Sequence, residues 1–201
     1  MPKPVEISKP SGKLGVLLVG LGAVSTTLIA GVEAVRLGLA KPFGSLTQMA
    51  TIRLGKRTEK RTPLIKDFVP LADVNDLVFG AWDIFPDDAF VAASKAAVLD
   101  ESLLKHLEPQ LRAIKPMKGA FDQRWVKRLA GNHVKDYRNK KDLADQVISD
   151  IKEFKEKADA SRLVMIWCGS TEAHTVVRPE HESVAAFENA LKKDSPEISP
   201  S

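Results

Sequence analysis

The sequence predicts an α/β fold, a Rossmann-like, doubly wound, mainly parallel sheet with flanking helices. Three apolar runs, at residues 14–19, 77–84 and 162–168, have the length and composition of strands, and the first and third resemble the buried strands of parallel sheets. The segments between the runs contain stretches with helical periodicity. Because strands alternate with helices, we expect one layered domain over residues 13–201, preceded by a flexible N-terminus of residues 1–12.

The first strand leads directly into a predicted helix. An apolar stripe at three- and four-residue spacing follows the strand, and the helix is expected to end near Leu37, with Gly38 at its end and Pro42 beyond. The stripe comprises Val24, Leu28, Val32, Val35 and Leu39.

Residues 44–76 interrupt the alternation of strands and helices. This segment has weak periodicity and two prolines, so we expect a long excursion with little regular structure. Connections of this length are uncommon and are often functional. Its basic cluster comprises Lys56, Arg57, Lys60 and Arg61, and we interpret Lys56, Lys60 and the later Lys118 as surface charge.

Two helices are predicted after the second strand, over residues 87–98 and 102–113. Pro86 followed by Asp87 and Asp88 is typical of a helix start, because carboxylates stabilise the first turn. We assign these two acids to the helix start and not to acid–base chemistry.

The last third of the chain contains a basic segment, two further helices and the third strand. No element is assigned to residues 115–141. Asp142 is expected to cap a helix, and another helix is predicted over residues 180–192. The stripe of the helix after Asp142 comprises Leu143, Val147, Ile151, Phe154 and Ala158.

Composition places the chain among ordinary globular proteins. It has 201 residues and a formal net charge of +4, and no apolar run approaches the ~20 residues needed to span a bilayer. Cys168 is the only cysteine, so no internal disulfide forms, and we expect a reduced, cytoplasmic protein without a membrane partner. Residues 105–141 carry 11 Lys and Arg, which suit a solvated surface, an anionic small ligand or nucleic acid.

The turn after the first strand has the features of a dinucleotide site. Gly20 and Gly22 occupy the first two glycine positions of the G-x-G-x-x-G pattern, and Ser25 stands in the third. The pattern lies between a predicted strand and a predicted helix, which is the context that the chemistry requires. Free backbone N–H groups at such a helix start bind phosphate, and Ser25, Thr26 and Thr27 add hydroxyl groups.

One part of the dinucleotide pattern is absent at its usual spacing. An acid about 20 residues after the glycines ordinarily binds the adenosine ribose, but residues 40–45 contain none. The nearest acid after a strand is Asp83, much later in the chain. An ordinary dehydrogenase pattern therefore fits poorly.

Four blocks together resemble one enzyme family. They are "GLGAVSTT" at residues 20–27, "DVNDLVFGAWDI" at 73–84, "IWCGSTE" at 166–172 and "EISPS" at 197–201. In this order they resemble myo-inositol-1-phosphate synthase in its bacterial form, and the resemblance covers nearly the whole chain after the first dozen residues. The chain departs from the eukaryotic pattern of that family at Ala23, Val24, Ser25, Ala81 and residues 168–170.

The resemblance implies NAD as the cofactor and assigns its binding residues. The residues expected to cradle the pyrophosphate are Gly20, Gly22, Ala23, Val24 and Ser25. Asp83 is expected to bind the adenosine ribose. The residues expected along the nicotinamide half are Gly169, Ser170 and Thr171.

The resemblance also implies a reaction and partners. The family converts D-glucose 6-phosphate to 1D-myo-inositol 3-phosphate by internal oxidation, enolisation, aldol cyclisation and re-reduction, and it forms homotetramers. Its catalytic lysines lie beyond the "EISPS" block, so we expect an N-terminal fragment with no catalytic residue and no activity alone. A dehydrogenase that releases NADH and a non-catalytic nucleotide- or nucleic-acid-binding module are the alternatives.

Other conspicuous residues have ordinary interpretations. Trp82 and Trp167 could each border a pocket or serve ordinary packing, and the sequence favours neither role. Cys168 is expected to be a small core residue. His174 and His181 lack a ligand-like pattern, so no metal site is expected.

Overall fold

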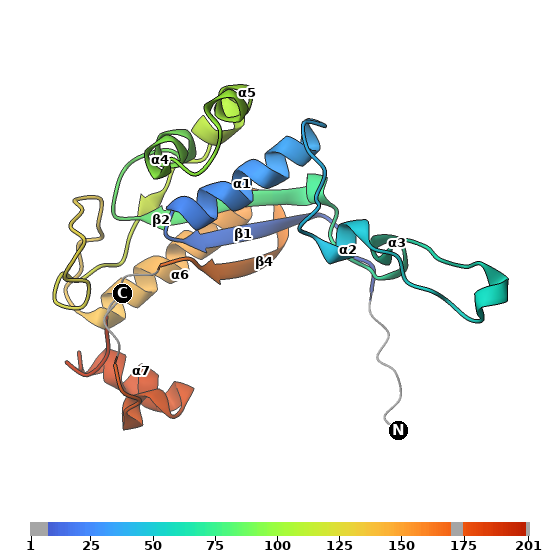
Figure 1. Cartoon of the computed structure of the whole chain (residues 1–201). Helices are drawn as coiled ribbons and strands as arrows, with labels where there is room; N and C mark the ends of the chain where they lie inside the picture. The colour runs from blue at the N-terminus through green and yellow to red at the C-terminus, as the bar shows by residue number, and fades with distance from the viewer. Residues whose placement is uncertain (1–7, 170–174, 200–201) are drawn as a thin grey trace, which may run out of the picture.

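The computed structural model describes residues 8–169 and 175–199 (Figure 1). Its centre is a four-stranded, fully parallel sheet in the order β3-β2-β1-β4. The strands are β1 (Lys13–Val19), β2 (Leu77–Asp83), β3 (Met117–Lys118) and β4 (Ala160–Trp167). The predicted parallel α/β architecture is confirmed.

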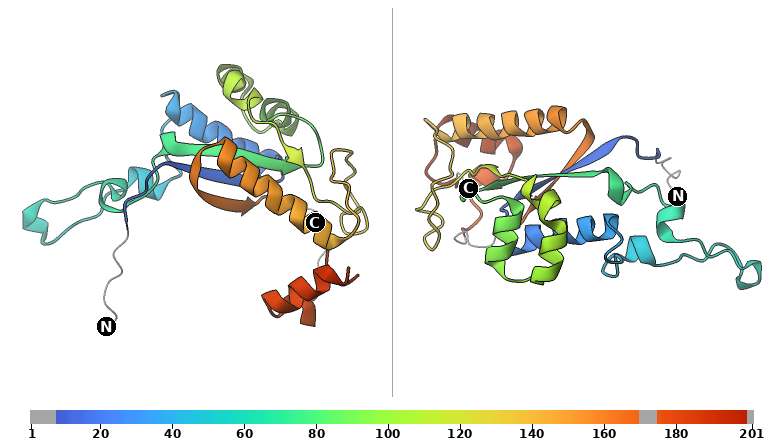
Figure 2. Two further views of the ribbon diagram at one scale, coloured as in Figure 1. Left: turned by 180° about the vertical axis from the view of Figure 1, so that it is seen from behind. Right: turned by 90° about the horizontal axis from the view of Figure 1, so that it is seen from above.

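Helices cover both faces of the sheet. One face carries α1 (Ala23–Arg36), α4 (Ala89–Ala96) and α5 (Glu101–Arg112), and the other carries α6 (Lys140–Lys157) (Figures 1 and 2). The chain adds β2 and β3 on one side of β1 and then returns to add β4 on the other side. The carboxyl ends of β1 and β4 are thus the point where the strand order reverses, the usual ligand position in such sheets.

The main core lies between the sheet and α1, α4 and α5. The largest fully buried side chains there belong to Leu18, Ile29, Leu107 and Leu111. Alanines keep the layers close where the helices contact one another and the sheet. These are Ala30, Ala34, Ala81, Ala89 and Ala93.

A single aromatic ring anchors α6 to the opposite face. A Cβ built on Gly15 would lie 2.9 Å from the Phe154 ring, and one on Gly80 would lie 2.7 Å from it. The two glycines on neighbouring strands therefore leave a hollow that Phe154 fills.

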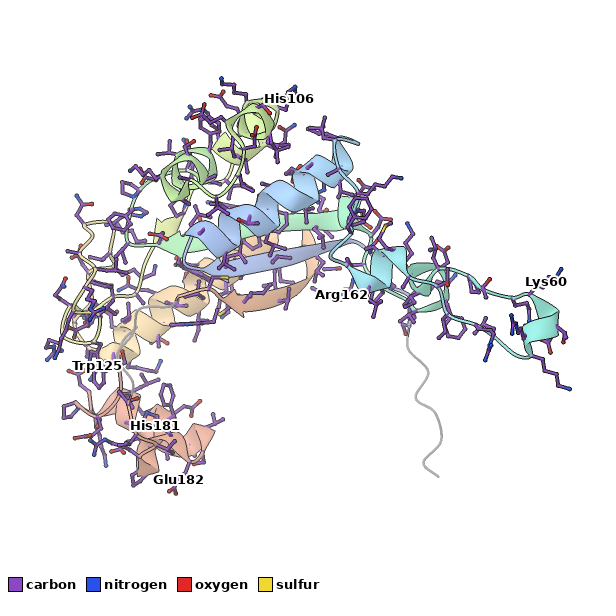
Figure 3. The ribbon with its side chains drawn as sticks, viewed as in Figure 1. Lys60, His106, Trp125, Arg162, His181 and Glu182 are labelled. Atoms are coloured by element: carbon purple, nitrogen blue, oxygen red, sulfur yellow. The ribbon has the colours of Figure 1, made fainter. Side chains whose placement is uncertain are left out.

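The excursion between α1 and β2 forms a projecting arm, defined here as residues 44–69. It contains the short helices α2 (Leu46–Met49) and α3 (Ile65–Phe68) and a 3-10 turn, η1 (Arg57–Glu59). Isolated antiparallel bridges join Thr51 to Leu64 and Leu54 to Arg61. The arm extends away from the sheet, with Lys60 at its tip (Figure 3). Lys56 and Lys60 are exposed, as expected, and regular structure in the arm is sparse.

The link from the arm to β2 is a second 3-10 turn, η2 (Val74–Asp76). Arg36, in the last turn of α1, donates from Nε to the carbonyl oxygen of Val74 at 2.9 Å and from its guanidinium to that of Leu77. Despite the length of the excursion, the chain thus returns directly beside the end of α1.

The third predicted strand is present, but its predicted burial is wrong. β4 is an edge strand of the described sheet, and Met165 and Trp167 are 50% and 56% exposed. An apolar run indicates which residues favour burial, whereas the position of the strand in the sheet decides whether other elements cover them. Arg162, also on β4, is exposed (Figure 3).

Two predicted helix boundaries also need correction. The helix α6 is capped by Asn139, three residues before the predicted cap, and the Asn139 side chain accepts from the backbone N–H of Asp142. The predicted helix over 180–192 is divided into η3 (Pro179–His181) and α7 (Val184–Lys192). Ser183 separates them by accepting from the N–H of Ala186, which makes it the cap of α7.

The predicted flexible N-terminus, residues 1–12, lies partly outside the described residues. Within the described part, Ser161 Oγ donates to the carbonyl oxygen of Ser11 at 2.5 Å. Across the part of the chain that the structure describes, no helix has the length and apolar character needed to cross a bilayer.

Candidate functional site

A cleft of about 680 Å³ lies at the carboxyl ends of the strands. This volume is within the range of small-molecule and cofactor sites. Its walls come from the glycine turn after β1, the end of β2, the end of β4, one side of α4, and the segment after β3. The cleft therefore occupies the topological switch point described above. Trp82 and Trp167 both line it, so both border a pocket.

The turn after β1 requires glycine at one position and open space at another. Gly20 has φ +94°, a conformation that L side chains rarely adopt, and its N–H donates to the carbonyl oxygen of Trp82 at 2.9 Å. Gly22 is the N-cap residue of α1 with φ −86°, and a Cβ built on it meets nothing within 4 Å. Gly20 fixes the turn, whereas Gly22 leaves free space at the helix start.

The first turn of α1 is arranged to receive an anion. It has no side-chain cap and no acidic residue. Gly22, Ala23 and Val24 are exposed, and Gly22 and Ala23 line the cleft. Uncapped N–H groups and the positive end of the helix dipole favour negative charge at this place.

The hydroxyl groups after the turn stabilise the turn itself. Ser25 is fully buried, and its Oγ donates to the carbonyl oxygen of Gly20 at 2.5 Å. Thr26 is also buried and donates from Oγ1 to the carbonyl oxygen of Gly22 at 2.9 Å. Both hydroxyl protons are therefore already used, and neither side chain lines the cleft. Ser25 shapes the turn through its side chain.

The carboxylate of Asp83 lies against the glycine turn. Asp83 is the last residue of β2, and its Oδ2 accepts from the N–H of Leu21 at 2.6 Å while Oδ1 accepts from the N–H of Phe85 at 3.0 Å. This is the usual place of the ribose-binding acid in a dinucleotide fold. The acid is absent at its ordinary sequence spacing because the arm lengthens the chain between the glycines and the second strand, but the fold still brings Asp83 to the turn.

The end of β4 closes the cleft on the other side of the turn. Cys168 is half-buried and its N–H donates to the carbonyl oxygen of Val19 at 2.9 Å. Trp167 Nε1 donates to the carbonyl oxygen of Gly169 at 2.7 Å. Gly169 lines the cleft, whereas Ser170 and Thr171 lie outside the described residues.

The segment after β3, residues 119–135, forms a wall of the cleft that sequence reasoning missed; it is called the wall loop below. Backbone hydrogen bonds attach both of its ends to the end of β2. The N–H of Gly119 donates to the carbonyl oxygen of Asp83 at 3.1 Å. The N–H of His133 donates to the carbonyl oxygen of Ile84 at 2.9 Å. Its cleft-lining residues are Gly119, Ala120, Phe121, Val126 and Leu129.

An ion pair stabilises the wall loop internally. The Arg124 guanidinium hydrogen-bonds both carboxylate oxygens of Asp122 and lowers the pKa of that carboxyl below its ordinary value of 3.8. The neighbouring Trp125 is labelled in Figure 3. The basic composition of residues 115–141 obscured the apolar residues that face the cleft, and no periodic signal marks them because the segment is irregular.

The chain matches known proteins over nearly its whole length. Residues 14–201 match an NAD-binding family model described as myo-inositol-1-phosphate synthase. Inositol-3-phosphate synthase 1 of Bacteroides thetaiotaomicron is 50% identical over 98% of this chain and 46% of its own length. Inositol-3-phosphate synthase 1 of Oryza sativa is 37% identical over 94% of this chain and 40% of its own length.

Solved structures agree with these sequence matches. The crystal structure of inositol-3-phosphate synthase from Caenorhabditis elegans superposes with a TM-score of 0.83 at 27% identity, covering 94% of this chain and 40% of that one. The chain thus spans less than half the length of these relatives. The matching family model is that of an NAD-binding domain, so NAD is the cofactor of this domain. With residues 14–201 covered by that model, the chain belongs to the myo-inositol-1-phosphate synthase family.

Proposed function

We propose that this chain, over residues 13–201, is the NAD-binding domain of an inositol-3-phosphate synthase that converts D-glucose 6-phosphate to 1D-myo-inositol 3-phosphate. Family membership and the names of the relatives support this activity. The observation that carries it is the convergence of an uncapped helix start and the Asp83 carboxylate in one cleft. When bound, NAD supplies reversible hydride transfer, and the protein orients the reacting groups.

The residues of the cleft fit the parts of NAD. The backbone N–H groups at Gly22, Ala23 and Val24 are placed for the pyrophosphate, since Gly22 leaves free space there. Asp83 is placed for the ribose hydroxyls beside them. The wall loop and α4 offer an apolar surface for the adenine ring.

The other end of the cleft is assigned to the nicotinamide half. Gly169 stands at the end of β4, next to the glycine turn. Ser170 and Thr171 remain part of this assignment by resemblance to the family. The functional residues proposed here bind cofactor, and we assign no catalytic or metal-ligating role to this chain.

The partners are proposed from the family as well. They are glucose 6-phosphate and three further copies of the protein in a cytoplasmic homotetramer, with no nucleic acid and no membrane. Five of the eleven Lys and Arg of residues 105–141 form ion pairs within the chain, which leaves fewer cations for phosphate. These are Arg112, Arg124, Lys135, Arg138 and Lys141.

Calorimetric titration of NAD tests this proposal directly. Asp83→Ala is expected to weaken NAD binding by about 10-fold or more, because hydrogen bonds to a charged group contribute about 1.5–3 kcal/mol. Asp67→Asn, an exposed change in the arm, is the matched control and should leave the affinity unchanged. Equal affinity of Asp83→Ala and the unaltered chain would refute the ribose assignment.

The type of reaction needs a separate measurement. Given NAD and glucose 6-phosphate, the chain is expected to form neither inositol phosphate nor net NADH by itself, since we assign only cofactor-binding roles to its residues. Inositol phosphate formed by the isolated chain would contradict the assignment of cofactor-binding roles alone to its residues. Stoichiometric NADH, measured by absorbance, would instead identify a dehydrogenase.

A further inference from the structure

A buried polar cluster lies behind the cleft. Asp150, on α6, accepts at Oδ2 from Trp82 Nε1 at 2.7 Å and lies 2.6 Å from Lys135 Nζ. The side chains of Lys135 and Asp150 are 8% and 18% exposed, and Trp82 is 5% exposed. The three residues come from the helix, the end of the wall loop and β2, so one carboxylate joins three separate elements.

The near-complete burial of Lys135 needs an explanation, because lysine is almost never buried without a partner. Removing an ammonium group and a carboxylate from water carries a desolvation penalty that an ion pair often fails to recover. A simple surface pair would give α6 the same solubility without that penalty, as Lys141 and Asp145 do on the same helix. The geometry therefore indicates a role for Asp150 in fixing position.

The Asp150 pair lies at the base of the wall loop. The N–H of Lys135 donates to the carbonyl oxygen of Gly119 at 2.9 Å, and the N–H of Gly119 lies 3.0 Å from the carbonyl oxygen of His133. These bonds close the loop, and the Lys135 side chain then attaches the closed loop to α6. Asp150 and Lys135 do not line the cleft, but the loop that they hold does.

We infer that Asp150 is a positioning residue for the adenine half of the cofactor. This inference rests on the proposed NAD site. Asp150 holds Trp82 and Lys135 in fixed relation, and so keeps the apolar wall loop at the distance from β2 that an adenine ring requires. The nicotinamide half lies near the end of β4 and makes no use of this loop. Loss of Asp150 should therefore weaken binding of adenine-bearing ligands selectively.

The test compares ligands that contain or lack adenine. NAD, ADP-ribose and nicotinamide mononucleotide are titrated into the unaltered chain, Asp150→Asn and Lys135→Met. For both variants the dissociation constants of NAD and ADP-ribose are expected to rise about tenfold, while that of nicotinamide mononucleotide stays within about twofold. Asp145→Asn is the matched control on α6, since its partner Lys141 is on the surface.

Amide hydrogen exchange gives a readout that needs no ligand. The N–H groups of Gly119, His133 and Lys135 should exchange faster in ligand-free Asp150→Asn, while those of β1 remain protected. Lys135→Met keeps the Trp82 bond but leaves the Asp150 carboxylate without its cation. The double variant Lys135→Met/Asp150→Asn removes both charges, which gives a further variant should a single variant unfold.

Two failures are distinguishable. If the unaltered chain binds NAD and both variants bind ADP-ribose as tightly as the unaltered chain does, the positioning role is overturned and the proposed function stands. Equal losses for ADP-ribose and nicotinamide mononucleotide, or an equal loss in Asp145→Asn, would also overturn it. If the unaltered chain itself binds no NAD, the proposed function falls.

Discussion

Replacing Gly22 by alanine tests the fold of the glycine turn separately from the phosphate binding that we propose for it. Gly22 has φ −86°, which alanine adopts without strain, and its added methyl group would meet no protein atom within 4 Å. The methyl group would instead occupy the space beside the first N–H groups of α1. We expect a folded protein that has lost most of its affinity for NAD.

The magnitude follows from the contacts that the methyl group prevents. A phosphate oxygen bound to a backbone N–H lies about 2.8 Å from the nitrogen, and a methyl carbon in that space displaces it. Losing one such charge-assisted bond costs about 1.5–3 kcal/mol, which corresponds to about 10- to 150-fold in the dissociation constant. Stability should change by less than about 1 kcal/mol, because the weaker cap is offset by the lower entropy of the unfolded chain.

Calorimetry with NAD and urea denaturation together measure the two effects of Gly22→Ala. Gly31→Ala is the matched control, because Gly31 also lies on α1 with open space around it but away from the cleft. That control should bind NAD normally and gain about 0.5–1 kcal/mol of stability. Normal NAD binding by a folded Gly22→Ala protein would refute the placement of the pyrophosphate at this helix start.

Three further changes test the packing, the helix caps and the wall loop. Phe154→Ala should lower the free energy of unfolding by about 2–3 kcal/mol in urea, because it empties the hollow under α6; a loss below ~1 kcal/mol would contradict that packing. Asp88→Ala should cost about 1 kcal/mol by removing the cap of α4, and Asp88→Asn clearly less, as thermal denaturation would show. The lowered pKa of Asp122 means that its pair with Arg124 stabilises the wall loop above pH 3.8 and is lost as the pH falls through that lowered pKa. The protection of the loop amides, measured relative to intrinsic exchange at each pH, should fall over that acid range, but not in Asp122→Asn.

The local elements of the fold could be predicted because their signals are local. A short apolar strand, two glycines and a helical stripe determine β1, the turn and α1 within a span of about two dozen residues, and each signal supports the others. The positions of the later helices could be predicted for the same reason. The burial of β4 could not be predicted, because the apolar residues of a strand do not indicate which elements pack beside it.

The residues of the cleft were predictable in part. The open space at Gly22 follows from the strand–turn–helix context, but the hydroxyl of Ser25 was expected to face phosphate and instead donates to the carbonyl oxygen of Gly20. Side-chain direction at a helix start depends on which backbone acceptor is within reach, and spacing in the sequence does not reveal this.

The sequence by itself determined the class of fold, the unit of strand, glycine turn and helix, and the family. Only the tertiary structure decided that Asp83 lies against that turn, and that the wall loop lines the same cleft. The physical reason is that hydrogen bonds and packing act over a few ångströms in space, whereas the arm separates β2 from the glycine turn along the chain without separating them in the sheet.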